Sequence, residues 1–572
     1  MGGTSGVFYT QFGATMAAAV GISAFNALTL CPALCAIFMR PVAEVKPGET
    51  PTLGQRYHAA FEAGFNRLGD KYIAALKLIN KSKFLVFILV AASIAALIFV
   101  GARTKTGLIP DEDTGTVFVS VTTPPGYTLS QTEEVASAVE KALSDIDEVE
   151  ITARVAGYNL MGGAASYSAA TFILRLKNWE ERVGEEHGKD AVIERIMMKT
   201  AGFKNALVFA FAPPMISGFG TTNGVEMYVQ DKSGGTVEAL NEVTTNFLAA
   251  LNQRPEVAVA LTTFNPRFPQ YRLEVDAVRC KRQNVSPSDV LNTLSMYIGG
   301  SYSSNINLFS KQYHVMVQAD QKYRLDTAAF KNMFVRSSTG QMLPVGQFLK
   351  LQRVNGPEML SRFNLFSSIS VNAAANEGYS SGNVINAIAE VAATTLPQGY
   401  GYDFGGMSRE EATQGNTTLI VYALCVIFVY LILCCLYESM LVPLSVLLSV
   451  PAGLFGAFLS AYLLGLENNI YMQTGVIMLM GLVSKTAILM TQYATDRRRQ
   501  GMEIVEAALS AARDRLRPIL MTALTTILGM IPLVADALFG SLAVTIMGGL
   551  FVGSLITLIF IPILYSLFFK VK

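Results

Sequence analysis

The sequence has few cysteines and histidines, and their positions exclude two kinds of structural site. Five of the six cysteines fall in long apolar stretches, which leaves Cys280 alone between residues 103 and 416. That segment cannot be held together by disulfides and must fold around its own core. The three histidines, His58, His187 and His314, lack the spacing of metal ligands. We therefore expect no metal site, no cofactor and no nucleic-acid partner.

Charged residues are also scarce, at 15% of the 572 residues, whereas apolar residues make up 51%. This balance is unusual for a soluble protein. Stretches of about 20 apolar residues, long enough to cross a bilayer core of ~30 Å, occur at residues 12–39, 84–102, 417–437, 442–464, 470–493, 518–535 and 541–569. We predict an α-helical transmembrane bundle with seven spans in this chain.

The positive charges of the short loops predict the orientation of these spans. Residues 40–83 carry eight Lys and Arg against four Asp and Glu, and residues 494–517 carry six against four, so both should be cytoplasmic. Residues 103–416 then lie outside the membrane. The first residues lack the order of a signal peptide. We expect Met1 to be an internal methionine of a longer protein; the alternative is a true start with inverted insertion.

Only one Lys, Arg, Asp or Glu lies inside the seven apolar stretches, and it is Lys485. Counting ~1.5 Å per residue from Asp496 places it about 15 Å deep, too far for easy snorkelling to the surface. A lone ammonium in hydrocarbon costs several kcal/mol unless it is paired or hydrated. Its counter-ion must come from outside these spans, which indicates ion-coupled transport by a larger assembly.

The external segment alternates between strand and helix patterns. Apolar residues alternate over residues 116–122, and Ser130 and Glu133 match the capping box of a helix. Strands are predicted next at residues 150–155 and 171–176. This order is typical of ferredoxin-like domains, and a similar pattern recurs in the second half of the segment, which suggests a duplication.

Four separated motifs resemble those of resistance-nodulation-division (RND) exporters of the hydrophobe/amphiphile efflux family, the AcrB-type multidrug pumps. They are Leu-Cys-Pro-Ala-Leu-Cys at residues 30–35, Leu-Ile-Pro-Asp-Glu-Asp-Thr-Gly at 108–115, Gly-Leu-Val-Ser-Lys-Thr-Ala-Ile-Leu at 481–489 and Arg-Leu-Arg-Pro-Ile-Leu-Met-Thr at 515–522. Such pumps have twelve spans in two similar halves. The chain resembles the C-terminal half together with the sixth span of the first half.

The resemblance implies a proton relay. In the family, an aspartate pair in the fourth span takes up protons, and that span would belong to the missing N-terminal half. Lys485 would pair with these aspartates, and Thr522 and Arg515 would complete the relay. Thr522 could instead bond its own backbone, and Arg515 could be a solvated charge at the cytoplasmic edge. Thr486 stands where the family usually has Asn.

The resemblance also assigns a substrate pocket outside the membrane. Phe209 and Phe211 match aromatic positions of the family's access pocket. Tyr158 and Leu160 lie in a glycine-rich segment, residues 157–163, that matches its switch loop. Aromatic surfaces suit varied hydrophobic ligands, because burial and stacking need little directional precision. Without the resemblance, Phe209 and Phe211 could simply be core residues of a strand.

The same resemblance divides the chain into parts and predicts its partners. The parts are residues 1–39 (a span), 40–83 (a cytoplasmic loop with an amphipathic helix), 84–102 (a span), 103–217 (a periplasmic porter subdomain), 218–267 with 357–416 (a second porter subdomain), 268–356 (a docking subdomain) and 417–572 (five spans). Residues 300–309 could form an arm that clasps a neighbouring subunit. The family implies a homotrimer in the bacterial inner membrane, with a periplasmic adaptor protein and an outer-membrane channel.

Three functions remain open. The first is the C-terminal portion of a proton-driven exporter of hydrophobic or amphiphilic compounds, which is a secondary transporter and not an enzyme. The second is an RND-type transporter of another cargo, such as lipid, and the third is a non-transporting membrane scaffold subunit. Asp111, Glu112 and Asp113 are consecutive, which indicates a loop or a cap rather than a pair of catalytic carboxylates.

Overall fold

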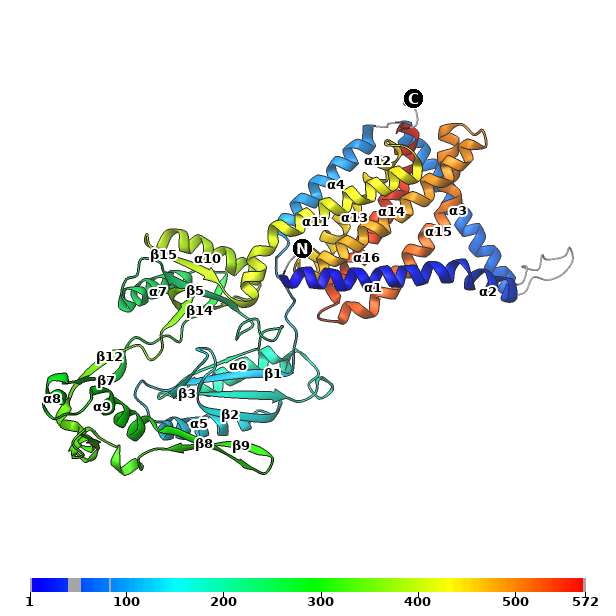
Figure 1. The fold of residues 1–572 in the computed structure, drawn as a ribbon. Helices are drawn as coiled ribbons and strands as arrows, with labels where there is room; N and C mark the ends of the chain where they lie inside the picture. Colours follow the sequence, from blue (N-terminus) through cyan, green and yellow to red (C-terminus); the bar gives the residue numbers. More distant parts are fainter. Residues whose placement is uncertain (1–2, 40–52, 82–83, 569–572) are drawn as a thin grey trace.

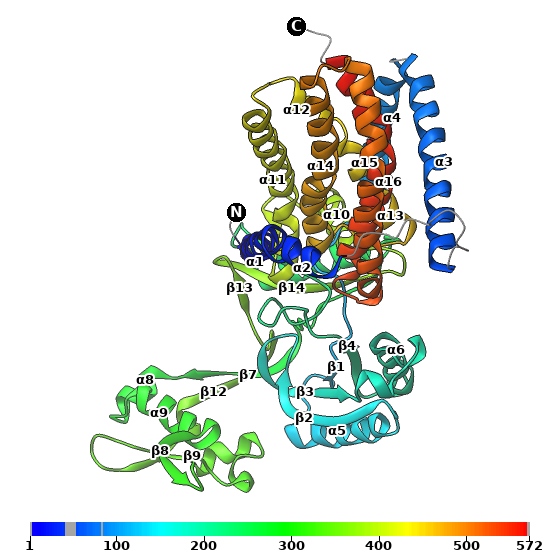
Figure 2. The same ribbon diagram turned by 90° about the vertical axis from the view of Figure 1, so that its right-hand side faces the viewer.

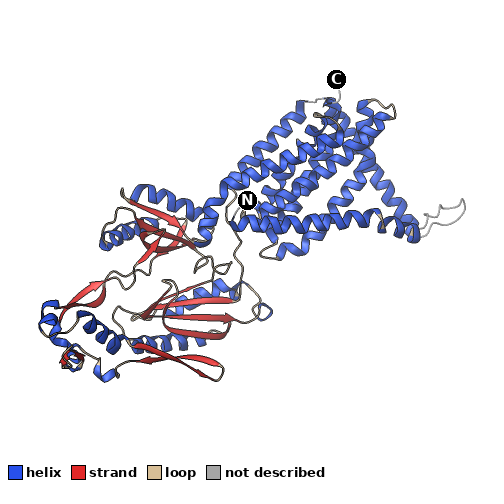
Figure 3. Ribbon diagram, viewed as in Figure 1, coloured by secondary structure: helices blue, strands red, loops and turns tan. Residues whose placement is uncertain are grey.

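The computed structural model describes residues 3–39, 53–81 and 84–568, so the predicted cytoplasmic loop 40–83 is described only in part. Long helices form a bundle, and an α/β region is joined to one end of it (Figures 1 and 3). Among the described residues, seven helical segments are long and apolar enough to span a membrane, as predicted. The helices of this part are α1 (Gly3–Leu28), α2 (Leu30–Phe38), α3 (Leu53–Lys81), α4 (Phe84–Arg103), α11 (Gly406–Tyr437), α12 (Val442–Leu447), α13 (Val450–Leu463), α14 (Ile470–Arg499), α15 (Ile504–Met530) and α16 (Gly540–Phe568).

Several of the predicted spans differ from the structure in where their helices begin or break. α1 ends at Leu28 and α12 ends at Leu447, which lie four residues before Pro32 and Pro451. A proline has no N–H for the carbonyl four residues earlier, and its ring crowds that carbonyl, so the helix is interrupted. α15 begins at Ile504, well before the predicted start, because its first turns bury a row of alanines against the bundle.

Close packing of α13 against α16 depends on glycines. A Cβ added at Gly456 would lie 2.6 Å from the carbonyl oxygen of Gly548 and 2.6 Å from Cβ of Val552. A Cβ added at Gly453 would lie 2.8 Å from Val483 of α14. Small residues let helix backbones approach closely in a membrane, where apolar surface gives little preference for protein over lipid. These glycines therefore fix the centre of the bundle.

α1 does not run alongside the other apolar helices. Figure 2 shows α11, α14, α15 and α16 side by side, whereas α1 is seen nearly end-on at the end of the bundle that carries the α/β region. Its first turns hold it there: Tyr9 donates to Gln473 at 2.7 Å, and Phe8 packs edge-on against Tyr471. Beyond these turns nearly every described residue of α1 is exposed.

The first subdomain of the α/β region is a four-stranded antiparallel sheet in the order β2-β3-β1-β4. Along the chain its elements are β1 (Thr116–Thr122), α5 (Leu129–Ser144), β2 (Val149–Asn159), β3 (Ala164–Leu176), α6 (Lys189–Thr200) and β4 (Leu207–Phe211). The full order is β-α-β-β-α-β, and its first four elements are the strand, helix, strand and strand that the sequence predicted. The capping box of α5 is formed by Thr128 and Gln131 rather than by Ser130 and Glu133, so that prediction was wrong. The turn that follows β1 ends at Tyr127, which makes Thr128 the first residue able to cap the helix.

The second subdomain repeats this topology. Its elements are β5 (Val225–Asp231), α7 (Val237–Leu251), β6 (Val257–Leu261), β14 (Phe366–Ala375), α10 (Ser381–Thr395) and β15 (Tyr400–Phe404). β6 pairs with β14, β14 with β5, and β5 with β15, so both sheets place their strands in the same order. The identical order supports the suggested duplication.

An insertion interrupts the second subdomain between β6 and β14. It opens with β7 (Phe268–Val275) and closes with β12 (Leu349–Gly356), which pair antiparallel from Phe268 opposite Gly356. The insertion predicted at residues 268–356 therefore begins at the first residue of β7 and ends at the last residue of β12. Between them, β8 (Ser301–Leu308) and β9 (Lys311–Val317) form an exposed hairpin at the position of the predicted arm (Figure 1).

Candidate functional site

Lys485 lies on an open face of the bundle. It is exposed on α14, and among the described residues it makes no hydrogen bond or ion pair. Gly481, Leu489 and Gln492 are also exposed and fall on the same side of the helix, four or three residues apart. The described helices therefore do not cover the side of α14 that carries the ammonium of Lys485.

Thr522 lies at the same depth as Lys485. Where α14 and α15 meet, Tyr493 donates a hydrogen bond to Asp514 at 2.9 Å. Lys485 lies eight residues before Tyr493 on α14, and Thr522 lies eight residues after Asp514 on the antiparallel α15. Both are therefore displaced in the same direction along the bundle by about 12 Å, at ~1.5 Å per residue. Thr522 is exposed, and its hydroxyl donates to the carbonyl of Ile519 at 3.0 Å. In this chain the hydroxyl is therefore occupied by its own backbone.

Arg515 lies in the N-terminal half of α15 (Ile504–Met530), the half that is farther from the α/β region. Its guanidinium lies 4.6 Å from the ring centroid of Tyr493, and Arg497 lies 5.0 Å from the same ring. Arg497 also donates to the hydroxyl of Tyr493 at 2.6 Å and to Asp514 at 3.2 Å. The structure thus places Arg515 in a cation–π cluster, about two helical turns away from the level of Lys485.

Phe209 and Phe211 lie on the outer face of the first sheet. The alternate residues Val208 and Ala210 belong to the core beneath α5 and α6. The two phenylalanine rings stack with centroids 5.8 Å apart, and Phe211 meets Phe118 edge-on at 5.9 Å. Neither ring belongs to the hydrophobic cluster beneath α5 and α6, although Phe211 is buried, with 7% of its surface exposed.

A cavity of about 640 Å³ opens beside these rings. It lies between the first subdomain, the second subdomain and the end of the bundle, and its lining includes Phe209, Phe211, Tyr379, Glu467 and Ser541. A volume of this size is typical of small-molecule sites. Phe209 and Phe211, the two residues predicted to contact substrate, therefore line a cavity of suitable size.

Tyr158 and Leu160 do not line this cavity. They lie at the end of the β2–β3 hairpin, where the hydroxyl of Thr171 donates to the carbonyl of Tyr158 at 2.9 Å and accepts from the N–H of Leu160 at 3.3 Å. Thr171 and Phe209 flank Ser120 in one row of the sheet. The hairpin end is thus held over the sheet face that carries Phe209. Phe209 lies two strands away from Thr171, which is about 10 Å.

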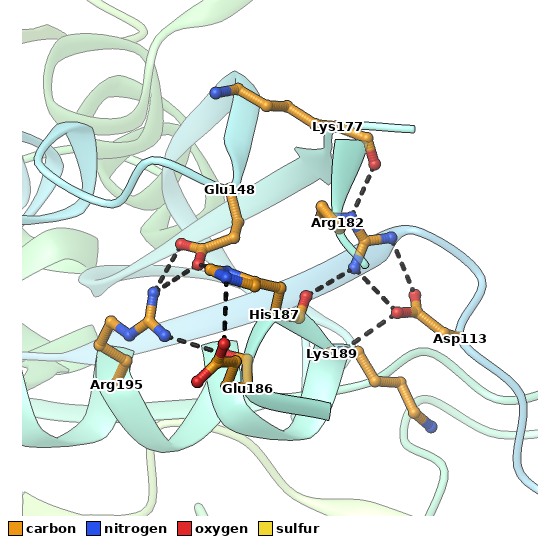
Figure 4. A network of polar contacts seen from close by, with 8 residues as sticks. All are labelled: Asp113, Glu148, Lys177, Arg182, Glu186, His187, Lys189 and Arg195. Atoms are coloured by element: carbon orange, nitrogen blue, oxygen red, sulfur yellow. Dashed lines mark hydrogen bonds and ion pairs between the residues drawn. The ribbon is translucent and has the colours of Figure 1, made fainter. Parts of the chain in front are cut away.

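The acidic motif of residues 111–113 has a role that sequence analysis described only as a loop or a cap. Asp113 accepts hydrogen bonds from Arg182 at 2.9 Å and from the N–H groups of Gly115 and Lys189 (Figure 4). Burial opposes the charge of Asp113, but the bonds from Arg182 and Gly115 prevail and lower its pKa. Asp111 pairs with the ammonium of Lys189. These contacts fasten the segment that leaves α4 to the first subdomain.

A second part of this polar network centres on Glu148, which sequence analysis missed. Its side chain is 4% exposed and accepts from Arg195 at 2.6 Å and from His187 at 2.7 Å (Figure 4). Although burial raises the pKa, the bonds from His187 and Arg195 outweigh it and lower the pKa of Glu148 to about 2. Its partners are 39 and 47 residues away along the chain. No local pattern in the sequence could therefore have indicated them.

Glu411 was also missed. It accepts a hydrogen bond from Ser381 at 2.9 Å and lines a cavity of about 400 Å³ between α10, α11 and the start of α14, together with Thr106, Asn386 and Asn468. Burial, with a smaller contribution from the charge of Glu467, raises the pKa of Glu411 to about 7. The junction between the α/β region and the bundle therefore contains a carboxyl group that titrates near neutral pH. Among the described residues, no group of three or more His, Cys, Asp or Glu is placed to hold a metal ion.

Comparison with known proteins gives one family over almost the whole chain. Residues 1–569 match the AcrB/AcrD/AcrF family. The chain is 33% identical over 571 residues to the multidrug/solvent efflux pump membrane transporter MepB of Pseudomonas putida, covering 99% of this chain and 54% of that protein. It is 33% identical over 585 residues to the multidrug export protein AcrF of Escherichia coli K12, covering 99% and 55%. The chain thus spans about half the length of the curated relatives it matches.

Proposed function

Because the chain belongs to the AcrB/AcrD/AcrF family, we propose that it is the C-terminal portion of a proton-driven exporter of hydrophobic or amphiphilic compounds. Relatives that match along 99% of this chain are named as multidrug or solvent efflux pumps. The activity, cargo and partners of those proteins are carried to this chain as part of the proposal. We further propose a bacterial inner-membrane location, a homotrimer, and contacts with a periplasmic adaptor protein and an outer-membrane channel.

The observation that carries the proposal is Lys485. It is an ammonium in the middle of a span, it has no partner among the described residues, and it faces away from the helices that surround it. A charge in that position is stable only when another surface brings carboxylates or water to it. We propose that intramembrane aspartates outside the residues of this sequence cover this strip of α14.

The proposed coupling follows from the opposite charges of Lys485 and these aspartates. When the aspartates are ionised, Lys485 is held between them; when they take up protons, the attraction is lost and the packing of α14 can change. Thr522, at the same depth, could exchange its bond to Ile519 for one to a carboxyl group. Arg515, whose guanidinium stays protonated, would act through its fixed positive charge on the path of protons released toward the far side of the bundle, from its cluster with Tyr493.

Cargo handling is proposed for the cavity beside Phe209 and Phe211, together with the hairpin end that carries Tyr158 and Leu160, which lies outside the cavity lining and about 10 Å from Phe209. The test uses cells that make the complete transporter containing these residues. Phe209→Ala and Phe211→Ala should increase the accumulation of bulky hydrophobic drugs by several-fold at matched protein levels, because each removes an aromatic wall. Tyr57→Ala, at an exposed position of α3 away from the cavity, is the control. Equal export by all variants would contradict the cargo assignment.

A further inference from the structure

A hydroxyl–carboxylate pair lies where α14 meets α15, about 12 Å along the bundle from the level of Lys485. Tyr493 of α14 donates a hydrogen bond to Oδ2 of Asp514 on α15 at 2.9 Å. The guanidinium of Arg515 lies 4.6 Å from the centroid of the same tyrosine ring. Tyr493 is therefore in contact both with Arg515, a residue of the proposed relay, and with a carboxylate that sequence analysis did not single out.

The proposed relay needs a group that can take up a proton at this end of the bundle. Arg515 and the neighbouring Arg497 cannot do so, because a guanidinium keeps its proton in proteins. Two carboxylates are close to them along the chain. Asp496 accepts a hydrogen bond from Gln492 of its own helix at 3.3 Å. Asp514 is bonded instead by residues of the adjacent helix, and 42% of its side chain is exposed. Asp514 therefore joins the contact between the two helices to solvent.

The charged groups around Asp514 come from three helices. Arg497 of α14 donates to Oδ2 of Asp514 at 3.2 Å and to the tyrosine hydroxyl at 2.6 Å. On α15 the hydroxyl of Ser510 lies 3.5 Å from the same carboxylate oxygen. The preceding residue, Arg513, pairs with Asp70 of α3 at 2.8 Å. Asp70 is thus neutralised separately, and Asp514 is the carboxylate that faces α14.

We propose that Tyr493 and Asp514 form the proton exit of the transporter, with Asp514 as the group that receives each proton and passes it to water. A hydrated proton that reaches Tyr493 binds its oxygen while the hydroxyl proton moves to Oδ2 of Asp514. One O–H bond of the tyrosine forms as the other breaks, so the tyrosine is unchanged and one proton has moved. The carboxyl group then releases this proton to solvent. The inference rests on the proposed function, because it extends the relay beyond Lys485 and Thr522.

The test measures drug transport by the complete transporter in liposomes, driven by a pH gradient that is acid outside. This gradient drives the molecules whose α/β region faces outward, so the lumen is on the side of Asp514. With little buffer in the lumen, Asp514→Asn and Tyr493→Phe should each slow transport at least about tenfold, as expected for the loss of a positioned proton acceptor or donor. Asp514→Glu should restore most of the rate. The variant carrying both Asp514→Asn and Tyr493→Phe should be no slower than either single variant, because both act on one path.

Rescue by buffer separates a proton acceptor from a residue that only ties the two helices together. Raising an impermeant buffer in the lumen from about 1 mM to about 50 mM should return Asp514→Asn to nearly the normal rate, because the buffer takes the proton directly. The unmodified transporter should change little. Asp496→Asn removes the other nearby carboxylate, so it is the matched control, and it should transport normally at both buffer concentrations.

Normal transport by Asp514→Asn at low buffer, or slow transport that buffer does not restore, would overturn the proposal. A defect in Asp496→Asn that buffer restores would also overturn it, because the exit would then belong to Asp496. Lys485→Ala, measured in parallel, separates this claim from the proposed function. If Lys485→Ala transports normally, the coupling fails; if it is inactive at both buffer concentrations while Asp514→Asn is normal, the exit assignment alone fails.

Discussion

Replacing Glu411 by Gln should stabilise the chain above neutral pH and leave it unchanged in acid. Glu411 is buried at the junction of the bundle and the α/β region, and its pKa is raised from 4.5 to about 7. A carboxyl group whose pKa is higher in the folded state contributes its full stability below the unfolded value. That stability is lost as the pH rises through the folded value.

The size of this effect follows from the two pKa values. Each tenfold change in proton affinity corresponds to about 1.4 kcal/mol, so the interval from 4.5 to about 7 corresponds to ~3 kcal/mol of lost stability. Glutamine carries no charge at any pH and can still accept the hydrogen bond from Ser381. Glu411→Gln should therefore be more stable than the unmodified chain by up to ~3 kcal/mol at about pH 8.

Thermal unfolding of the detergent-solubilised chain between about pH 4, below the unfolded pKa of Glu411, and about pH 8 measures this difference. The melting temperatures of Glu411→Gln and the unmodified chain should coincide in acid and diverge as the pH rises. Glu238→Gln, at an exposed glutamate on α7, should show no divergence. A constant gap across the pH range, or a variant that is less stable at alkaline pH, would refute the assignment of a buried, near-neutral carboxyl group.

Two further changes test the packing and the polar network. Glu148→Gln should destabilise the chain by about 2 kcal/mol at neutral pH, because Arg195 and His187 lose a buried anionic partner. The lowered pKa of Glu148 stabilises the fold above pH 4.5, and this stability is lost as the pH falls toward about 2. The difference in melting temperature between the variant and the unmodified chain should therefore become smaller in acid. A difference that stays constant with pH would contradict the ion pairing. Gly456→Ala should destabilise the bundle by about 1–3 kcal/mol through overpacking. The control is Gly529→Ala, which should not destabilise it, because a Cβ there meets nothing within 4 Å. Equal melting temperatures of the two variants would contradict the close approach of α13 and α16.

The sequence predicted the features that depend on local pattern or on the cost of charge in a membrane. The seven apolar helices and the repeated strand order follow from run length and periodicity, and Lys485 stood out because no other charge lies inside the apolar stretches. Helix ends were less accurate. The breaks before Pro32 and Pro451 were foreseeable from proline geometry, but the early start of α15 depends on tertiary burial.

Features that depend on long-range contacts could not be predicted. Alternation over residues 207–211 indicated a strand, but it could not tell which face of the sheet would meet the helices and which would carry Phe209. Glu411 resembles any glutamate near the end of a span until Ser381, some 30 residues earlier, packs against it. Glu148 and its partners are likewise brought together only by the fold.

The most direct test of the account is proton-driven transport by the Lys485→Ala variant of the complete transporter, reconstituted in liposomes with an imposed pH gradient. Loss of the ammonium should raise the pKa of the carboxylates proposed to face it, so that they hold their protons and cannot cycle. Drug transport should therefore be abolished at unchanged protein content, and Lys485→Arg should also be impaired, since a planar guanidinium is not equivalent to a compact ammonium. Lys281→Ala, at an exposed lysine of α8 (Ala277–Arg282) in the α/β region, should transport normally. Near-normal, gradient-dependent transport by Lys485→Ala would contradict the proposed coupling.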